Sequence, residues 1–167
     1  YYKKDTSFDK ISVTFYEDTY SLYNLYRFAH YYEEAYGKYI WLKSGASLVI
    51  EHTEAMTVID VNTGSVLKKK RQEDTLFYQI NREAAKEIAR QIRLRNISGI
   101  IMIDFINMKD EKQKEKLLLL LENECRKDRI HCNVVDMTAL NLVEMTRSKV
   151  RRPLLEQITV CRKMQKN

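Results

Sequence analysis

Two aspartates stand at the C-terminal ends of apolar segments that have the composition of strands. Asp60 lies in VIDVN and Asp104 in MIDFIN, and an asparagine follows each of them, Asn62 and Asn107 respectively. Polar side chains at the point where a chain leaves a sheet lie at the sheet rim, where ligands commonly bind. Magnesium favours oxygen ligands, often one or two carboxylates completed by water and substrate phosphate. The two matching patterns therefore indicate one shared magnesium site.

The same aspartates have a second interpretation, in which each side chain caps the turn or helix that follows it. An unpaired carboxylate inside an apolar run is costly, and this cost favours a metal ligand. Receiver-like α/β domains also place acids at strand ends around magnesium, so the pattern is not specific to one activity. Spacing alone does not decide between metal ligands and caps.

Basic residues follow the first aspartate and gather again near the C-terminus. The run KKKR consists of Lys68, Lys69, Lys70 and Arg71; it could bind RNA phosphates or form a solvated loop. The residues from Leu142 onward contain two acidic side chains against seven basic ones, namely Arg147, Lys149, Arg151, Arg152, Arg162, Lys163 and Lys166. Such a segment suits a polyanion, although a basic tail that binds nothing has the same composition.

Aromatic residues crowd the N-terminal segment at helical spacing between Leu22 and Tyr36. They are Tyr16, Tyr20, Tyr23, Tyr26, Phe28, Tyr31, Tyr32 and Tyr36. Aromatic side chains at this spacing usually pack against neighbouring structure, but they could also stack bases. The histidines, His30, His52 and His131, are scattered, and no nucleophilic triad or glycine-rich phosphate loop is evident.

The aspartates must be positioned by short strands and amphipathic helices. Antiparallel strands are expected over 39–42, 47–52 and 56–61, then a helix capped by Asp74 and Thr75 that ends near Asn96. The apolar run 99–105 predicts a strand covered on both faces. A helix over 110–127, a strand over 132–137 and a short helix over 140–147 follow. This order predicts an α+β (α/β-like) fold, a mixed sheet with packed helices.

Length and composition fit one ordinary globular core. The 167 residues are 44% hydrophobic and include one Pro and four Gly, and a chain of this size needs no disulfide to fold. The odd number of cysteines, Cys125, Cys132 and Cys161, predicts free thiols and a reducing compartment. No apolar run reaches the length of a membrane-spanning helix. We therefore expect a cytoplasmic protein.

Three ordered blocks of the sequence resemble the catalytic domain of the ribonuclease E/G family. They are TEAMTVIDVNTG at 53–64, NREAAKEIARQIRLRNISGIIMIDFINM at 81–108 and LVEMTRSKVR at 142–151. The resemblance implies a deoxyribonuclease-I-like catalytic subdomain over 36–157. By the same resemblance, residues 1–35 are the C-terminal part of a ribonuclease-H-like subdomain, and residues 158–167 are a remnant of a zinc-link region.

The resemblance also implies the chemistry. Asp60 and Asp104 fall on the family's two magnesium-binding aspartates, with Mn²⁺ as a possible substitute, and Asn62 falls on an asparagine that helps to orient the site. The implied activity is magnesium-dependent endonucleolytic hydrolysis of single-stranded RNA, which leaves a 5′-phosphate on the downstream product. It further implies an RNA-binding domain upstream of Tyr1, so we expect the isolated chain to be weakly active.

Three departures from the family pattern motivate an alternative. Asn107 replaces a carboxylate, and His131 stands where the family has an arginine near the active site. The element CRKM keeps Cys161 but has Met164 at the second position, so we expect no zinc and regard a homo-oligomer as possible but not zinc-linked. The alternative is a catalytically degenerate relative that binds RNA or scaffolds partners. Cleavage of RNA by the full-length protein discriminates the two.

Overall fold

A mixed sheet of six strands organises the chain, in a computed structural model that describes residues 15–64 and 73–164. The strands are β1 (Tyr39–Trp41), β2 (Ser47–His52), β3 (Met56–Asn62), β4 (Gly99–Asp104), β5 (Cys132–Met137) and β6 (Leu142–Arg147). Their order in the sheet is β1-β2-β3-β4-β6-β5. Only β3 and β4 are parallel, and all the other neighbouring pairs are antiparallel. The expected mixed sheet with packed helices is confirmed.

Helices precede, connect and follow the strands. They are α1 (Leu22–Leu25), α2 (Phe28–Tyr36), α3 (Glu73–Leu94), α4 (Glu111–Cys125) and α5 (Leu154–Met164). The long connection between β3 and β4 contains α3, as parallel neighbours require. Asp110 caps α4, because its side chain accepts a hydrogen bond from the backbone N–H of Lys112. The helical spacing predicted between Leu22 and Tyr36 is confirmed by α1 and α2.

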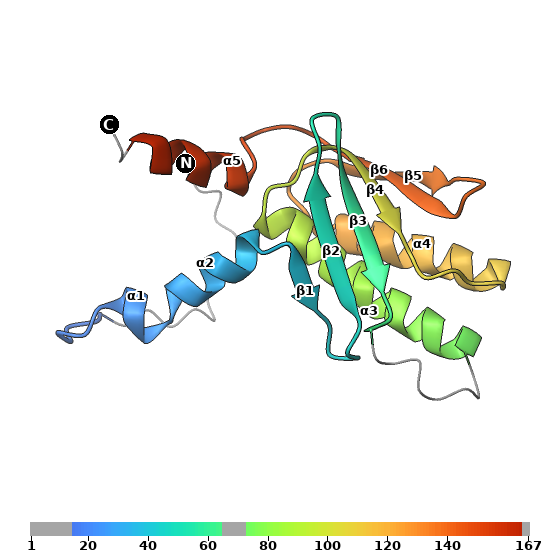
Figure 1. The fold of residues 1–167 in the computed structure, drawn as a ribbon, viewed down its shortest axis with the longest axis horizontal. Coiled ribbons are helices and arrows are strands. Elements are labelled where there is room, and N and C mark those ends of the chain that lie inside the picture. Colours follow the sequence, from blue (N-terminus) through green and yellow to red (C-terminus); the bar gives the residue numbers. More distant parts are fainter. Residues whose placement is uncertain (1–14, 65–72, 165–167) are drawn as a thin grey trace, which may run out of the picture.

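Helices α3 and α4 cover one face of the sheet, and among the described residues no helix covers the opposite face over β1 to β4, which we call the open face (Figure 1). The core lies beneath these helices; fully buried members include Leu48, Ile59, Ile88, Ile103 and Leu117. The expectation that β4 is covered on both faces is therefore wrong. Ile101 and Ile103 are buried, but Ile100 on the other face is 49% exposed, because both long helices pack on the same side.

Two further expectations of local structure are wrong. Residues 142–147 form strand β6 and not a helix, and their side chains alternate between partial exposure and burial, with Val143, Met145 and Arg147 buried. Pairing with β4 on one side and β5 on the other overrides the helix-like spacing. Asp74 and Thr75 lie inside α3, so neither is its cap. Helix α5 was not expected at all.

Cys125, at the end of α4, and Cys132, at the start of β5, are free thiols as expected. The side chains of Cys161 and Met164 lie outside the described residues, so the expectation of no zinc stays a prediction. Within the described ranges, no helix is both long and apolar enough to cross a membrane.

Candidate active site

The two aspartates lie side by side where β3 and β4 end. Asp60 and Asp104 are partners in the parallel register of these strands, and partner residues point to the same face of a sheet. Within β3, Ile59 and Val61 on either side of Asp60 are buried in the core, so Asp60 points to the opposite, open face. Asp104 likewise follows the buried Ile103. Both carboxyl groups therefore share one position on the open face.

An amide contacts Asp60, and the charge of Asp60 acts on the neighbouring Asp104 carboxyl. Asn62, two residues along the same face, donates a hydrogen bond from Nδ2 to Asp60 Oδ2 at 2.7 Å. Partial burial raises the pKa of the Asp104 carboxyl, and the negative charge of Asp60 raises it further. Two acids that repel each other in this way gain stability from a shared cation. The asparagine fixes one of them in place.

The loop after Asp104 is held by a buried side chain of α3. Asn81 is fully buried; its Nδ2 donates to the carbonyl of Ile106 at 2.7 Å, and its Oδ1 accepts from the backbone N–H of Ile106 at 3.0 Å. This pair of hydrogen bonds fixes the chain two residues beyond Asp104. Asn81 lies within one of the blocks that resemble the family, but nothing in its spacing marked it as a positioning residue.

Replacing Asn81 with Ala is expected to lower the free energy of unfolding by about 2 to 3 kcal/mol, because the Ile106 amide loses its partner and both hydrogen bonds disappear. The loop then holds Asp104 less firmly, so Mn²⁺ affinity is expected to fall by about 10-fold or more. Urea unfolding and Mn²⁺ titration measure the two effects. Lys86→Ala, an exposed change on the same helix, is the matched control. Unchanged Mn²⁺ affinity in the Asn81 variant contradicts the positioning role.

A second α3 side chain holds the turn between β1 and β2. The Glu83 carboxylate accepts hydrogen bonds from the backbone N–H groups of Lys43, at 2.7 Å, and Ser44, at 3.3 Å. The turn also touches the chain just after β3, because a Cβ placed on Gly64 would lie 2.6 Å from the carbonyl oxygen of Gly45. Gly64 has φ of +57°, which also favours glycine. Helix α3 thus anchors loops at one end of the sheet on both sides of the aspartates.

The donor set fits a magnesium ion. Two carboxylates at one register position match the one or two protein carboxylates that magnesium commonly uses, with the remaining positions left to water and substrate phosphate. In residues 15–64 and 73–164, no group of three or more His, Cys, Asp or Glu side chains is arranged to hold a metal. These residues thus do not surround a metal ion with protein ligands. A metal ion held by two carboxylates alone would keep coordination positions for water and substrate.

Asn107 and His131, which were also singled out in the sequence, do not join the pair. The run 68–71 lies outside the described residues. Asn107 is exposed in the loop after β4. His131 immediately precedes Cys132 of β5, which pairs with Arg147 at one end of β6, and Arg147 in turn pairs with Gly99 of β4. Asp104 pairs with Leu142 at the other end of β6. His131 is thus at the opposite end of the sheet, about 17 Å along the strands at 3.3 Å per residue.

One of the basic residues counted toward a polyanion surface is buried instead. The Arg147 guanidinium donates from Nε to Asp128 Oδ2 at 2.9 Å, and from Nη1 to Asn96 Oδ1 and the Ile97 carbonyl, each at 2.9 Å. The Arg147 and Asp128 side chains are 3% and 8% exposed. Arg147 is thus a structural residue, unavailable to RNA. His52 has a hydrogen-bonding partner within the sheet, because its Nδ1 lies 3.0 Å from Thr57 Oγ1.

Comparison with known proteins identifies similar chains. The model of the Ribonuclease E/G family matches residues 1–150. The chain is 42% identical to Ribonuclease G of Escherichia coli (strain K12) over 133 residues, which are 80% of this chain and 27% of that protein. It is 43% identical to Ribonuclease G of Haemophilus influenzae over the same shares. It is 42% identical to Ribonuclease E of Nostoc sp. over 69% of this chain and 17% of that protein. The chain thus spans about a quarter or less of these relatives.

Proposed function

The chain belongs to the ribonuclease E/G family, and from this premise we propose that it forms the catalytic core of an endoribonuclease that cuts single-stranded RNA. The observation that carries the proposal is the placement of Asp60 and Asp104 as register partners on the open face of the sheet. No requirement of folding calls for two repelling carboxylates at one position. A bound magnesium ion would neutralise the repulsion between the two carboxylates and could hold the phosphate of a phosphodiester.

In this proposal Asp60 and Asp104 bind Mg²⁺, for which Mn²⁺ can substitute, and Asn62 holds the Asp60 carboxylate in orientation through its 2.7 Å hydrogen bond. A bound magnesium ion would lower the pKa of a water molecule and stabilise negative charge on the scissile phosphate. Hydrolysis then leaves a 5′-phosphate on the downstream product. Residues 68–71, which lie outside the described residues, are proposed to bind RNA phosphates.

The proposal extends to the organisation of the larger protein. Residues 36–157 form the catalytic subdomain, residues 1–35 the end of a preceding subdomain, and residues 158–167 a remnant of a link that no longer binds zinc. Because the chain spans only 27% of the Ribonuclease G relatives, we expect the isolated chain to cut RNA weakly and the full-length protein to be more active. The full-length protein is proposed to act in the cytoplasm, as a monomer or as a homo-oligomer without a zinc link.

The test is cleavage of a 5′-labelled single-stranded RNA by the full-length protein, with magnesium or with excess EDTA. Cleavage is expected with magnesium, to be lost with EDTA and to return when Mn²⁺ is added, because the proposed ligands are two carboxylates that bind either ion. The downstream product is expected to be a substrate for an enzyme that requires a 5′-phosphate. RNA binding without cleavage in either metal would contradict the proposal and favour the degenerate relative.

A further inference from the structure

The open face of the sheet carries two aromatic side chains in line with the aspartate pair. Tyr39 of β1 pairs with Val49 of β2, which pairs with Asp60, which pairs with Asp104. These four residues form one row across the sheet, and partners in a row share a face. The next row runs from Trp41 through Ser47 to Asn62. Each aromatic is thus two strands from the residue of β3 in its row, about 10 Å away.

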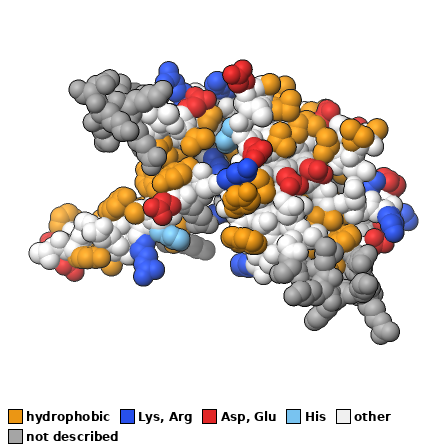
Figure 2. Space-filling view, viewed as in Figure 1, with side chains coloured by type: hydrophobic (Ala, Val, Ile, Leu, Met, Phe, Trp, Pro, Cys, Tyr) orange, Lys and Arg blue, Asp and Glu red, His pale blue; other side chains and the backbone are white. Residues whose placement is uncertain are grey.

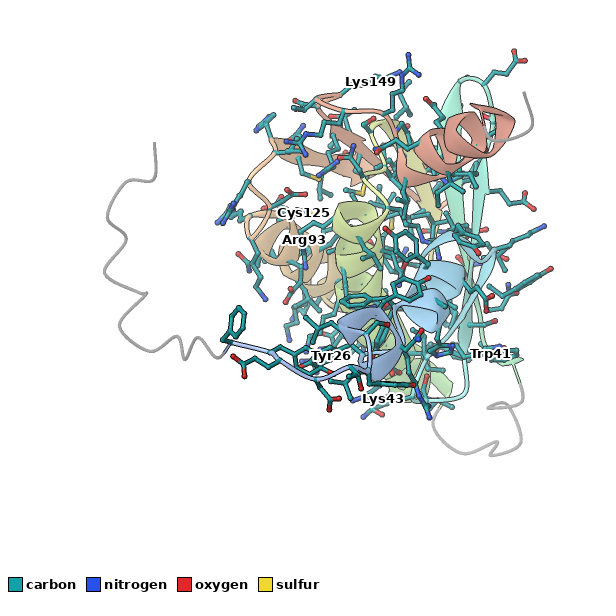
Figure 3. All side chains as sticks on the ribbon, turned by 90° about the vertical axis from the view of Figure 1, so that its left-hand side faces the viewer. Tyr26, Trp41, Lys43, Arg93, Cys125 and Lys149 are labelled. Carbon is teal, nitrogen blue, oxygen red and sulfur yellow. The ribbon has the colours of Figure 1, made fainter. Side chains whose placement is uncertain are left out.

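Both aromatic side chains are exposed, and none of the helices within residues 15–64 and 73–164 lies above them. Trp41 is 73% exposed and Tyr39 is 60% exposed, whereas Ile40 between them is buried in the core. Figure 2, which looks onto the open face, shows hydrophobic side chains over β1 and acidic ones over β3 and β4. In Figure 3, Trp41 lies at the sheet, and Arg93 and Cys125 lie on the side covered by α3 and α4. The exposed rings of Trp41 and Tyr39 are thus free to pack against a ligand at this face.

The surroundings of β1 suit a nucleic-acid strand. Lys38 lies with Nζ 5.7 Å from the centroid of the Tyr39 ring and forms an ion pair with Glu51, whose charge it neutralises. Lys43, in the turn after Trp41, is exposed, and its backbone is fixed by Glu83. Aromatic faces with lysines beside them bind single-stranded nucleic acids by stacking bases and attracting phosphates.

We propose that Trp41 and Tyr39 form a stacking platform for the bases of single-stranded RNA next to the scissile phosphate. The platform deepens the proposed function and rests on it, since the aspartates give the RNA its position. A strand whose phosphate lies at Asp60 and Asp104 places neighbouring bases over β1 along the two rows. The aromatic residues of the N-terminal helices are a weaker platform, because Tyr23 and Tyr26 each contact Phe28 and no strand pairing ties them to the aspartates.

The chain offers a direct measurement, because Trp41 is its only tryptophan. Titrating the chain with a short A- and U-containing RNA strand, made resistant to cleavage by phosphorothioate linkages and with magnesium present, is expected to quench Trp41 fluorescence saturably. A duplex of the same RNA is expected to quench it much less. Trp41→Ala is expected to weaken binding of the labelled strand, measured by anisotropy, by about 10-fold, and Trp41→Phe by much less. Tyr26→Ala, an exposed aromatic away from the sheet, is the matched control.

Salt dependence separates stacking from charge. The slope of log affinity against log salt concentration is expected to be the same in Trp41→Ala as in the unchanged chain, because the variant loses no phosphate contact. Trp41 is exposed, so the variant is expected to keep the circular dichroism spectrum of the unchanged chain. In the active full-length protein, Trp41→Ala is expected to raise KM while kcat is retained.

Each outcome bears on one of the two proposals. RNA that binds without quenching Trp41, or a Trp41→Ala chain of unchanged affinity, overturns the platform and leaves the nuclease proposal standing. If RNA quenches Trp41 and Trp41→Ala weakens RNA binding, the platform is supported. If the full-length protein at the same time fails to cut RNA, the nuclease proposal is contradicted. Trp41→Ala could instead change the sedimentation coefficient of the chain while RNA affinity stays the same. This result also overturns the platform, because it shows that Trp41 lies in an interface between copies of the chain.

Discussion

Replacing Asp60 or Asp104 with Asn in the full-length protein is expected to reduce magnesium-dependent RNA cleavage by at least about 100-fold, because a carboxylate that binds the metal is lost and with it several kcal/mol of charge stabilisation. The two carboxylates are proposed to hold one ion, so the double variant is expected to lose little more than either single variant. Initial rates with a labelled single-stranded RNA measure the loss.

The same substitutions have a readout that does not depend on activity. Mn²⁺ binding to the 167-residue chain, followed by electron paramagnetic resonance, is expected to weaken by at least about 10-fold in each variant. Asp136→Asn is the matched control. Asp136 is also an exposed aspartate in a strand, but its strand β5 is separated by β6 from β4, which carries Asp104. If a variant with either aspartate replaced cuts RNA as fast as the unchanged protein and binds Mn²⁺ equally well, Asp60 and Asp104 are not the metal ligands.

The sequence predicted which residues could bind a metal, but it did not predict their register. Asp60 and Asp104 were recognisable because each ends an apolar strand. Register is a property of the assembled sheet, and a slip of one residue would turn one carboxyl group to the core. The parallel pairing of β3 with β4 removes that ambiguity. The same pairing revealed the rows that join Tyr39 and Trp41 to the site, since β1 reaches β3 only through β2.

Local patterns were misleading where tertiary contacts override them. The run 99–105 is apolar throughout, as in a strand with two covered faces, but α3 and α4 pack on the same side of β4. Residues 142–147 carry apolar side chains at spacings that also fit a helix, and only the neighbouring strands make them β6. Asn81 and Glu83 look like ordinary polar residues of a helix. Their roles appear only when the loops they hold are in place.

Arg147 illustrates why charge counted along a sequence is a weak guide to a binding surface. Its charge belongs to the basic C-terminal segment by position, but its side chain enters the core from β6 and bridges Asp128 to the turn at Asn96 and Ile97. Burial would raise the pKa of Asp128, but hydrogen bonds from Arg147 and the Ile130 backbone, with the charges of Arg147 and Arg93, outweigh it and hold the pKa below its usual range. The ion pair therefore contributes to stability.

Replacing Arg147 with Ala is expected to lower the free energy of unfolding by about 3 to 5 kcal/mol, because it leaves Asp128 as a buried charge without its partner. Lys149→Ala, an exposed basic residue two positions later, is the matched control and is expected to change stability by less than about 0.5 kcal/mol. Urea unfolding near neutral pH measures both. A loss below 1 kcal/mol in the Arg147 variant, on the order of an exposed pair, would contradict the structural role.

The pH dependence of this loss has a definite sign. The folded-state pKa of Asp128 lies below the unfolded value of about 3.9, so between these two values the unfolded chain binds more protons. The contribution of the pair is therefore fully present above the unfolded pKa and is lost as pH falls through the folded pKa. The difference in unfolding free energy between the unchanged chain and Arg147→Ala is expected to be constant from pH 7 down to about pH 5 and to shrink in more acidic solution. A difference that stays constant through the acid range would show that Asp128 does not titrate with the pair.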